Sequence, residues 1–231
     1  MARGPASFGR DLLAAAIFVG ALFKPHVAAP FFWLLMTRSG RLRPAVLTVL
    51  GYAVFTAVAL MFRPIELAGY LESFDWSTRM GTSARVADLG VLLGWFGMAR
   101  QAAVVTLGLV AALGLWLWLR RRAALWPTLG VTAVVTRMLM YHRWYDDLMM
   151  LVPLIALFRV AKQSKSPTDR CVAGVLFAAL WATLLAPGTV YVLPPPWHVI
   201  AGWAQTAVWL VVAAYLVVIV ERSARGGEVG A

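Results

Sequence analysis

Long apolar stretches, separated by short polar segments, run along almost the whole chain. The clearest of them cover residues 45–62, 101–119, 123–141, 148–160, 171–185 and 199–220. Several approach or exceed the roughly 20 residues that a helix needs to cross a bilayer. Because every backbone polar group must be satisfied inside the hydrocarbon, such stretches are expected to be helical. The pattern therefore predicts an all-α polytopic membrane protein with about six transmembrane helices.

The first apolar region is interrupted by a polar turn. Residues 12–23 and 27–36 are each too short to span comfortably, and a Lys-Pro-His sequence lies between them at 24–26. Proline disfavours helix at the residue before it and removes a backbone donor. We therefore predict a re-entrant pair of half-helices over residues 12–36. The alternatives are one kinked helix whose Lys24 extends toward the interface, and a cleaved signal peptide.

The remaining polar segments predict the surroundings of this membrane region. We expect one membrane domain over residues 1–222. Residues 63–88 form its longest polar stretch and predict an outer loop with a short amphipathic helix at the interface. Residues 223–231 are rich in glycine and predict a disordered tail.

Composition agrees with the pattern and excludes one class of partner. The 231 residues are 61% hydrophobic and 13% charged, with a net charge of +11. The basic residues fall in short clusters between apolar stretches, which is typical of cytoplasmic loops and not of a nucleic-acid interface. Cys171 is the only cysteine, so no intrachain disulfide can form. The bilayer is the expected partner, and nucleic acid is not.

The distribution of Lys and Arg gives the chain an orientation. With both termini and the loops at 38–43, 120–122 and 159–170 inside, the cytoplasmic side holds 14 of the 21 Lys and Arg. The positive-inside rule favours this arrangement. It places the 24–26 turn, the 63–88 loop and the segment 141–147 outside. We therefore predict a multi-pass protein of the plasma (cytoplasmic) membrane with both termini cytoplasmic and its chemistry on the extracytoplasmic face.

The segment 141–147 carries one histidine, one arginine, two tyrosines and two aspartates between two apolar stretches. Ionisable groups near bilayer depth are costly, so they pair, face a cavity or carry function. On a helix, His142 and Asp146 share a face with Tyr145, while Arg143 and Asp147 form a second pair four residues apart. One interpretation is local charge pairing. The other is a histidine whose tautomer and charge are set by Asp146, so that it binds a phosphate or sugar oxygen or relays a proton.

A second candidate position is the turn at Lys24, with His26 beside it. A lysine in a wet turn suits an anionic group such as phosphate. The histidines and carboxylates show no recognised ligand spacing, so we expect no metal and no cofactor. A phosphate-cradling glycine loop and a nucleophile elbow are both absent from the sequence. A phosphate-bearing substrate is therefore expected to arrive from the lipid.

Two of these elements resemble glycosyltransferase family 87. The first is Ala-Leu-Phe-Lys-Pro-His-Val at residues 21–27, followed by the arginines of 38–43. The second is His-x-x-Tyr-Asp-Asp-Leu at residues 142–148, followed by Pro153, which is similar to the family's His-x-x-Tyr-Asp-Leu stretch ahead of an apolar run. The resemblance covers about residues 12–159.

This resemblance implies a GT-C-type membrane enzyme. Such a hexosyltransferase takes a hexose, here expected to be mannose, from a polyprenyl-phosphate carrier. It transfers the sugar with inversion to an envelope glycolipid or glycan on the extracytoplasmic face. The resemblance assigns to the donor phosphate and sugar the residues Lys24, His26, His142, Arg143, Tyr145 and Asp146. It leaves the catalytic residue open, with Asp146 and His142 as candidates for proton transfer.

The sequence departs from the family at the general base that deprotonates the acceptor. In the much longer family members this carboxylate lies in the first outer loop of an N-terminal half. None of the outer carboxylates here is in the matching position: Glu66, Glu72, Asp75 and Asp88. We therefore expect a C-terminal half or truncated form of such an enzyme. The alternatives are a non-catalytic membrane subunit that completes a separate N-terminal-half protein, and a small transporter, which usually shows two matching halves.

Overall fold

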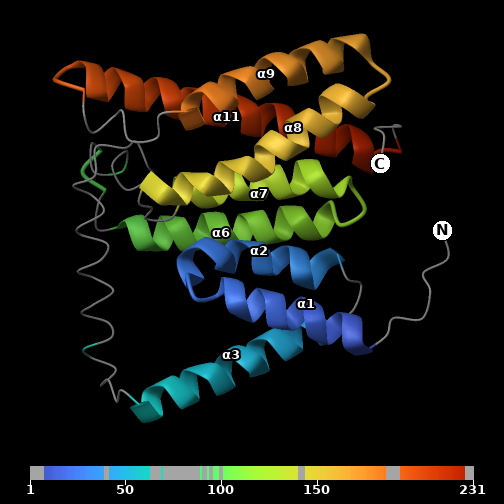
Figure 1. Ribbon diagram of the computed structural model, residues 1–231, viewed down its shortest axis with the longest axis vertical. Coiled ribbons are helices and arrows are strands. Elements are labelled where there is room, and N and C mark those ends of the chain that lie inside the picture. The colour runs from blue at the N-terminus through green and yellow to red at the C-terminus, as the bar shows by residue number, and fades with distance from the viewer. Residues whose placement is uncertain are drawn as a thin grey trace. The chain divides into compact units, whose positions relative to one another are not determined.

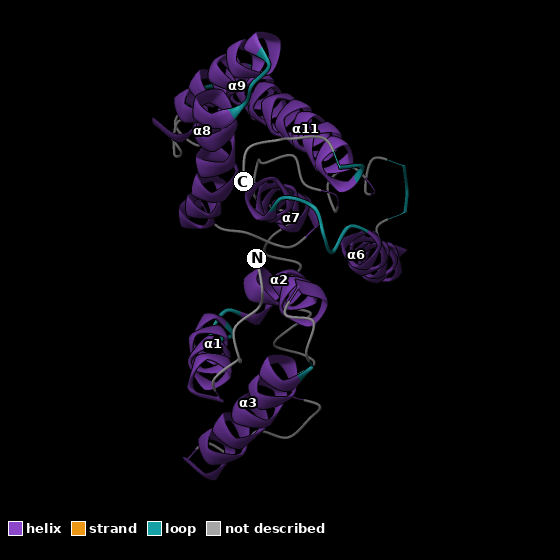
Figure 2. Cartoon of the chain, turned by 90° about the vertical axis from the view of Figure 1, so that its right-hand side faces the viewer, coloured by secondary structure: helices purple, strands orange, loops and turns teal. Residues whose placement is uncertain are grey.

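The computed structural model describes residues 8–38, 42–62, 69, 89, 93, 96–98, 101–139, 144–185 and 193–226. Within these residues the regular secondary structure is helical throughout, with no strand (Figure 2). This confirms the predicted all-α class. Contacts divide the chain into two compact units, Met1–Thr78 and Arg79–Ala231. The expected single membrane domain over residues 1–222 stays a prediction, and each unit is described by itself.

The first unit contains three helices, α1 (Phe8–Ala21), α2 (Pro25–Arg38) and α3 (Arg43–Phe62). The predicted break falls at the turn of residues 22–24, so the chain forms two helices here and not one kinked helix. The Lys24 carbonyl accepts hydrogen bonds from the backbone N–H groups of Val27 (3.0 Å) and Ala28 (3.1 Å). These bonds begin α2 directly after the turn, where Pro25 needs no hydrogen-bond partner for its nitrogen.

Three contacts show that α1 and α3 run in the same direction. Asp11 pairs with Arg43 at 3.8 Å. A Cβ on Gly51 would lie 3.1 Å from the Val19 side chain, and the rings of Phe23 and Phe55 are 5.0 Å apart. The three contacts follow one another in the same order and at the same spacing along both segments, so the two helices are parallel. The connecting helix α2 therefore returns the chain to the end at which α1 begins. This geometry agrees with a hairpin of two short helices; its re-entry into a membrane stays a prediction.

The second unit contains the other described elements (Figure 1). They are α6 (Ala102–Leu119), α7 (Leu125–Leu139), the 3-10 helix η2 (Trp144–Met150), α8 (Leu151–Gln163), α9 (Pro167–Leu185) and α11 (Trp197–Ala224). Residues of α7, α8, α9 and α11 form a single hydrophobic core around Trp209, Leu157 and Leu216, none of which is exposed. The helix α11 ends at Ala224, so the first two residues of the predicted tail are helical. Ser223 is held there by its hydroxyl, which accepts a hydrogen bond from the Ala124 N–H at 3.1 Å.

The helix α7 is buried on most of its surface, including polar positions. Its hydroxyls at Thr128, Thr132 and Thr136 donate to the carbonyls four residues earlier, at 2.6, 2.9 and 2.7 Å. These bonds satisfy the hydroxyl donors within the helix itself. Small residues of this kind let helices approach closely inside a membrane, where lipid provides no hydrophobic drive for association.

Polar contacts at two levels fix the register of α7 and α9 against α11. At the first level, Arg120 binds Glu221 and Arg222 binds Asp169. At the second, the Arg137 guanidinium carbon lies 4.9 Å from the centre of the Trp209 ring, and Trp209 also contacts α9. The levels are 13 residues apart from Ala124, which directly precedes α7 and binds Ser223, to Arg137. They are 14 apart on α9, from Asp169 to Thr183, and 12 apart on α11, from Glu221 to Trp209, which is about 20 Å at the rise of an α-helix. Both α7 and α9 are therefore antiparallel to α11, as Figure 1 shows.

In the part of the chain that the structure describes, three helices are long and apolar enough to cross a membrane: α3, α9 and α11. Shorter apolar stretches lie in α2, α6 and α7. Large hydrophobic side chains are exposed on α3 and α6, for example Val54 at 64% and Leu107 at 70%. These observations support a membrane protein; the number of six crossing helices stays a prediction. The predicted amphipathic helix within residues 63–88 lies outside the described residues.

Replacement of Gly130 by alanine tests the close packing of α7. A Cβ there would lie 2.6 Å from Leu216 Cδ1, 3.2 Å from the Pro153 Cα and 3.3 Å from the Ala156 Cβ. The leucine end can move, but the backbone of α8 resists. We expect Gly130→Ala to lower the free energy of unfolding by about 1–3 kcal/mol, measured by detergent-induced unfolding followed by circular dichroism.

The matched control is Gly174→Ala in α9, where an added Cβ meets nothing within 4 Å. Alanine has the higher helix propensity, by up to about 1 kcal/mol, so this variant should be as stable as the parent chain or slightly more stable. Equal stability of the two variants would show that α7 and α8 are not in close contact at Gly130.

Candidate functional site

A buried ion pair joins the end of α7 to η2. The Arg137 Nε donates to Asp147 Oδ1 at 2.6 Å, and the two side chains are only 2% and 6% exposed. Arg137 stands in the last turn of α7, and Asp147 lies at the centre of η2. The pair therefore closes the connection between α7 and α8 across residues 140–143, which lie outside the described residues.

Trp209 covers the guanidinium of this pair from the middle of α11. The Arg137 guanidinium carbon lies 4.9 Å from the centre of the indole ring, within the range of a cation–π interaction. The Trp209 Nε1 in turn donates to the Thr183 hydroxyl of α9 at 3.2 Å. Trp209 is completely buried, so the interaction is desolvated and stronger than it would be at a surface. One arginine thus joins α7, η2, α11 and, through the indole, α9.

The position of this pair makes it energetically expensive. It lies between helices, about 20 Å along α11 from the contact between Arg120 and Glu221, and both side chains are almost completely buried. Two charges taken from water into such surroundings are tolerated only with good geometry and further hydrogen bonds. Ionisable residues in membrane segments mark functional positions by default. The Arg137–Asp147 pair is therefore the first candidate for a functional centre in the described residues.

The local sequence explains why a 3-10 helix precedes α8. Pro153 is the third residue of α8. An α-helix continued backward from there would need a donor on the nitrogen of Pro153 and would bring its ring against the carbonyl of Met149. The tighter 3-10 turns avoid this conflict. In a 3-10 helix residues three apart lie on one face, and Asp147 and Met150, at that spacing, are both buried.

This geometry corrects one part of the sequence interpretation of segment 141–147. The part described, Trp144–Met150, is not an α-helix, so a spacing of four residues does not define its faces. The sequence paired Asp147 with Arg143, and the structure shows that Asp147 also pairs with Arg137, which the sequence analysis did not predict. Of the predicted donor-binding residues, Tyr145 and Asp146 are placed on η2 by their backbones. His142 and Arg143 lie outside the described residues, so their pairings stay predictions.

The other two predicted site residues belong to the first unit. Lys24 lies in the turn between α1 and α2 with a partly buried side chain, and His26 is in the first turn of α2. The structure thus places Lys24 at a helix-to-helix turn, as the sequence predicted. No group of three or more His, Cys, Asp and Glu side chains comes together among the residues that were described.

Sequence reasoning missed the residues that hold this centre. Arg137 carried a signal, because it is the only charged residue in the apolar stretch 123–141, but the sequence does not indicate its partner. Trp209 and Thr183 gave none: one of eleven tryptophans and a threonine in an apolar helix are unremarkable. Only the antiparallel register of α9 and α11 brings them together.

Comparisons of the chain with protein-family models, with curated proteins and with solved structures found no match. Functional inference therefore depends on the residues and their geometry.

Substitution of Arg137 tests whether the pair holds the second unit together. Arg137→Ala removes the guanidinium that the buried Asp147 binds and should lower the free energy of unfolding by about 3–5 kcal/mol. The double variant Arg137→Met/Asp147→Leu removes both charges and should recover most of that loss, because apolar residues of similar volume can replace a buried pair. Unfolding by detergent, followed by circular dichroism, measures all three free energies.

Arg222→Ala is the matched control, because Arg222 pairs with Asp169 at 3.0 Å with a side chain that is 56% exposed. An exposed pair of the same chemistry should contribute less than about 1 kcal/mol. If Arg137→Ala is as mild as Arg222→Ala, the buried pair does not stabilise the unit.

Proposed function

We propose that the chain is a membrane glycosyltransferase, or the C-terminal half of one, that takes a hexose from a polyprenyl-phosphate carrier. The observation that supports this best is the buried Arg137–Asp147 pair. It fixes, at one end of the second unit, the segment in which the sequence places the donor-binding residues. A chain that holds a polar segment in place with a buried charge pair inside apolar helices has a use for that segment beyond packing.

The arrangement of charge agrees with an extracytoplasmic site. The basic loops of the second unit, at residues 120–122 and 159–170, join the end of α11 that carries Arg222. The connection from α7 to α8 lies at the other end of these helices, about 20 Å away. Under the positive-inside rule the basic end is cytoplasmic. The segment 141–147 then faces the compartment in which lipid-linked sugars are used.

In this proposal each site residue has a separate role. The sequence resemblance assigns the carrier phosphate to the positive charges of Lys24 and Arg143, and the hexose to His142, Tyr145 and Asp146. The bond between the sugar's anomeric carbon and the phosphate oxygen breaks as the acceptor hydroxyl oxygen bonds to that carbon from the opposite face. Polyprenyl phosphate leaves with the bonding electrons, and a base takes the hydroxyl proton. Arg137 is a positioning residue that holds η2 through Asp147.

The catalytic base distinguishes this function from a second candidate function. Asp146 and His142 are candidates within this chain, but no outer carboxylate matches the position of the family's base. That observation favours a non-catalytic membrane subunit, in which the chain binds the lipid-linked sugar and a separate partner supplies the carboxylate. The two functions share the donor site and differ in whether the purified chain turns over alone.

Turnover of polyprenyl-phosphate-linked mannose by the reconstituted chain, with a glycolipid acceptor, tests the proposal. Lys24→Ala should raise the KM for the donor, since it removes a contact to the phosphate. His142→Ala should lower kcat by about 100-fold or more if the histidine transfers a proton. The control is His198→Ala, which removes a histidine at the start of α11 outside the predicted site.

Unchanged turnover in both Lys24→Ala and His142→Ala would reject the assignment. No turnover by the parent chain, together with donor binding that both variants lose, would instead identify the non-catalytic subunit.

A further inference from the structure

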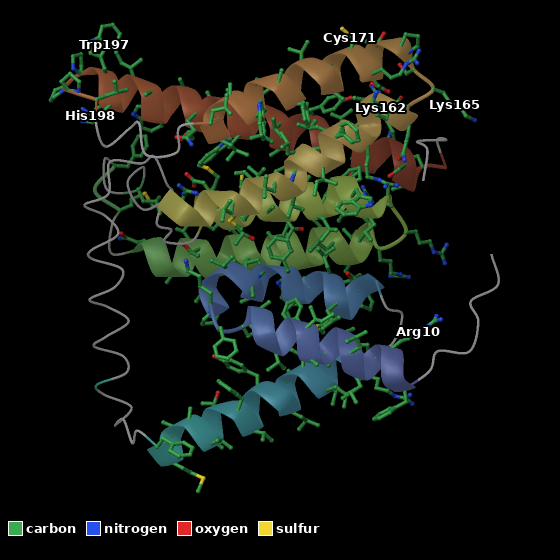
Figure 3. The ribbon with its side chains drawn as sticks, viewed as in Figure 1. Arg10, Lys162, Lys165, Cys171, Trp197 and His198 are labelled. Atoms are coloured by element: carbon green, nitrogen blue, oxygen red, sulfur yellow. The ribbon has the colours of Figure 1, made fainter. Side chains whose placement is uncertain are left out.

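We propose that the basic end of the second unit is a binding surface for anionic phospholipid head groups. This basic end comprises the turn between α6 and α7, the loop between α8 and α9, and the last turns of α11. Its exposed cations are Arg121, Arg122, Lys162, Lys165, Arg170, Arg222 and Arg225. Lys162 and Lys165 lie together beside the start of α9, whereas Trp197 and His198 lie at the far end of α11 (Figure 3).

The acidic residues described at this end are already used by two of its arginines. Arg120 Nε binds Glu221 Oε1 at 2.7 Å, and this hydrogen bond raises the pKa of Arg120 above its usual value. Arg222 binds both carboxylate oxygens of Asp169, at 3.0 and 3.2 Å. Within the described part of the chain, Asp169 and Glu221 are the acids of the basic end. The seven exposed cations and Arg120 outnumber these two acids, so the basic end is a net positive surface.

Three cations of this end are held against aromatic rings, at the level where the helices become apolar. Arg121 lies 5.1 Å from the Trp118 ring, Arg159 lies 5.5 Å from the Trp126 ring, and Lys162 lies 6.0 Å from the Phe158 ring. Tryptophan side chains collect at membrane–water interfaces. The two pairs with Trp118 and Trp126 therefore place a charge at the expected depth of a lipid phosphate.

Apolar side chains directly beside these cations favour a lipid over a soluble anion. Trp118 is 51% exposed, Leu119 is 61% exposed and Leu125 is 45% exposed, on either side of Arg121 and Arg122. A head group that binds the two arginines would bring its acyl chains against these residues. Basic clusters immediately next to transmembrane helices attract anionic lipids by about fivefold in affinity for each cation near the surface. The occupant of this surface is thus an anionic phospholipid of the same leaflet, whatever reaction the chain performs.

Titration of the purified chain with short-chain phosphatidylglycerol, followed by native mass spectrometry, tests this surface. The parent chain should bind phosphatidylglycerol more tightly than phosphatidylcholine of equal chain length. Arg121→Gln/Arg122→Gln should weaken phosphatidylglycerol binding by about 25-fold, at about fivefold for each charge. Both positions are exposed, so the variant should fold, and its thermal unfolding is measured alongside.

Two matched variants separate charge from other effects. Arg121→Lys/Arg122→Lys keeps both charges, and Arg120→Gln/Glu221→Gln removes one charge of each sign. Each should retain phosphatidylglycerol affinity within about twofold. Equal affinity for the two lipids, or parent-like binding by Arg121→Gln/Arg122→Gln, would overturn the proposal. Displacement of the lipid by excess inorganic phosphate alone would also overturn it, because the site would then bind a free anion.

Discussion

The second unit is organised by the need to satisfy a charged pair inside apolar helices. Neither Arg137 nor Asp147 can lose its partner without leaving a buried charge, and Trp209 and Thr183 extend their contacts to α11 and α9. This constraint fixes the end of α7, the start of α8 and the middle of α11 relative to one another. The ion pair also anchors η2, the 3-10 helix that precedes α8. The α-helix cannot extend into this segment, because Pro153 near its start would lack a backbone donor and clash with the preceding turn.

A second set of polar contacts lies near the other end of the same helices. Glu221 and Asp169 bind Arg120 and Arg222, and these contacts are partly exposed and individually weak. Together the two sets keep α7 and α9 antiparallel to α11 and separate the unit into a basic end and an end with the candidate site. We propose an anionic lipid surface at the basic end and a lipid-carried substrate at the other end.

Much of the helical arrangement could be predicted from sequence because apolar stretches and proline positions are local signals. The break at Lys24, the class of fold and the clustering of basic loops follow from such signals. The pairing of Arg137 with Asp147 could not be predicted, because ten residues separate them in the sequence and only the packing of η2 against α7 brings them together. The type of helix at Trp144–Met150 was also missed, although Pro153 carried the information. The roles proposed for His142 and Lys24 remain predictions from sequence resemblance.

The central claim is that the basic end and the η2 end of the second unit face opposite sides of a membrane. In a Cys171→Ser background, a single cysteine is introduced at Lys165 in the basic end or at Leu148 in η2, which is 66% exposed. Each variant is then treated with a membrane-impermeant maleimide in intact spheroplasts and in inverted vesicles. The account predicts that Lys165→Cys is labelled only in inverted vesicles and Leu148→Cys only in spheroplasts. Labelling of both positions from the same side would contradict it.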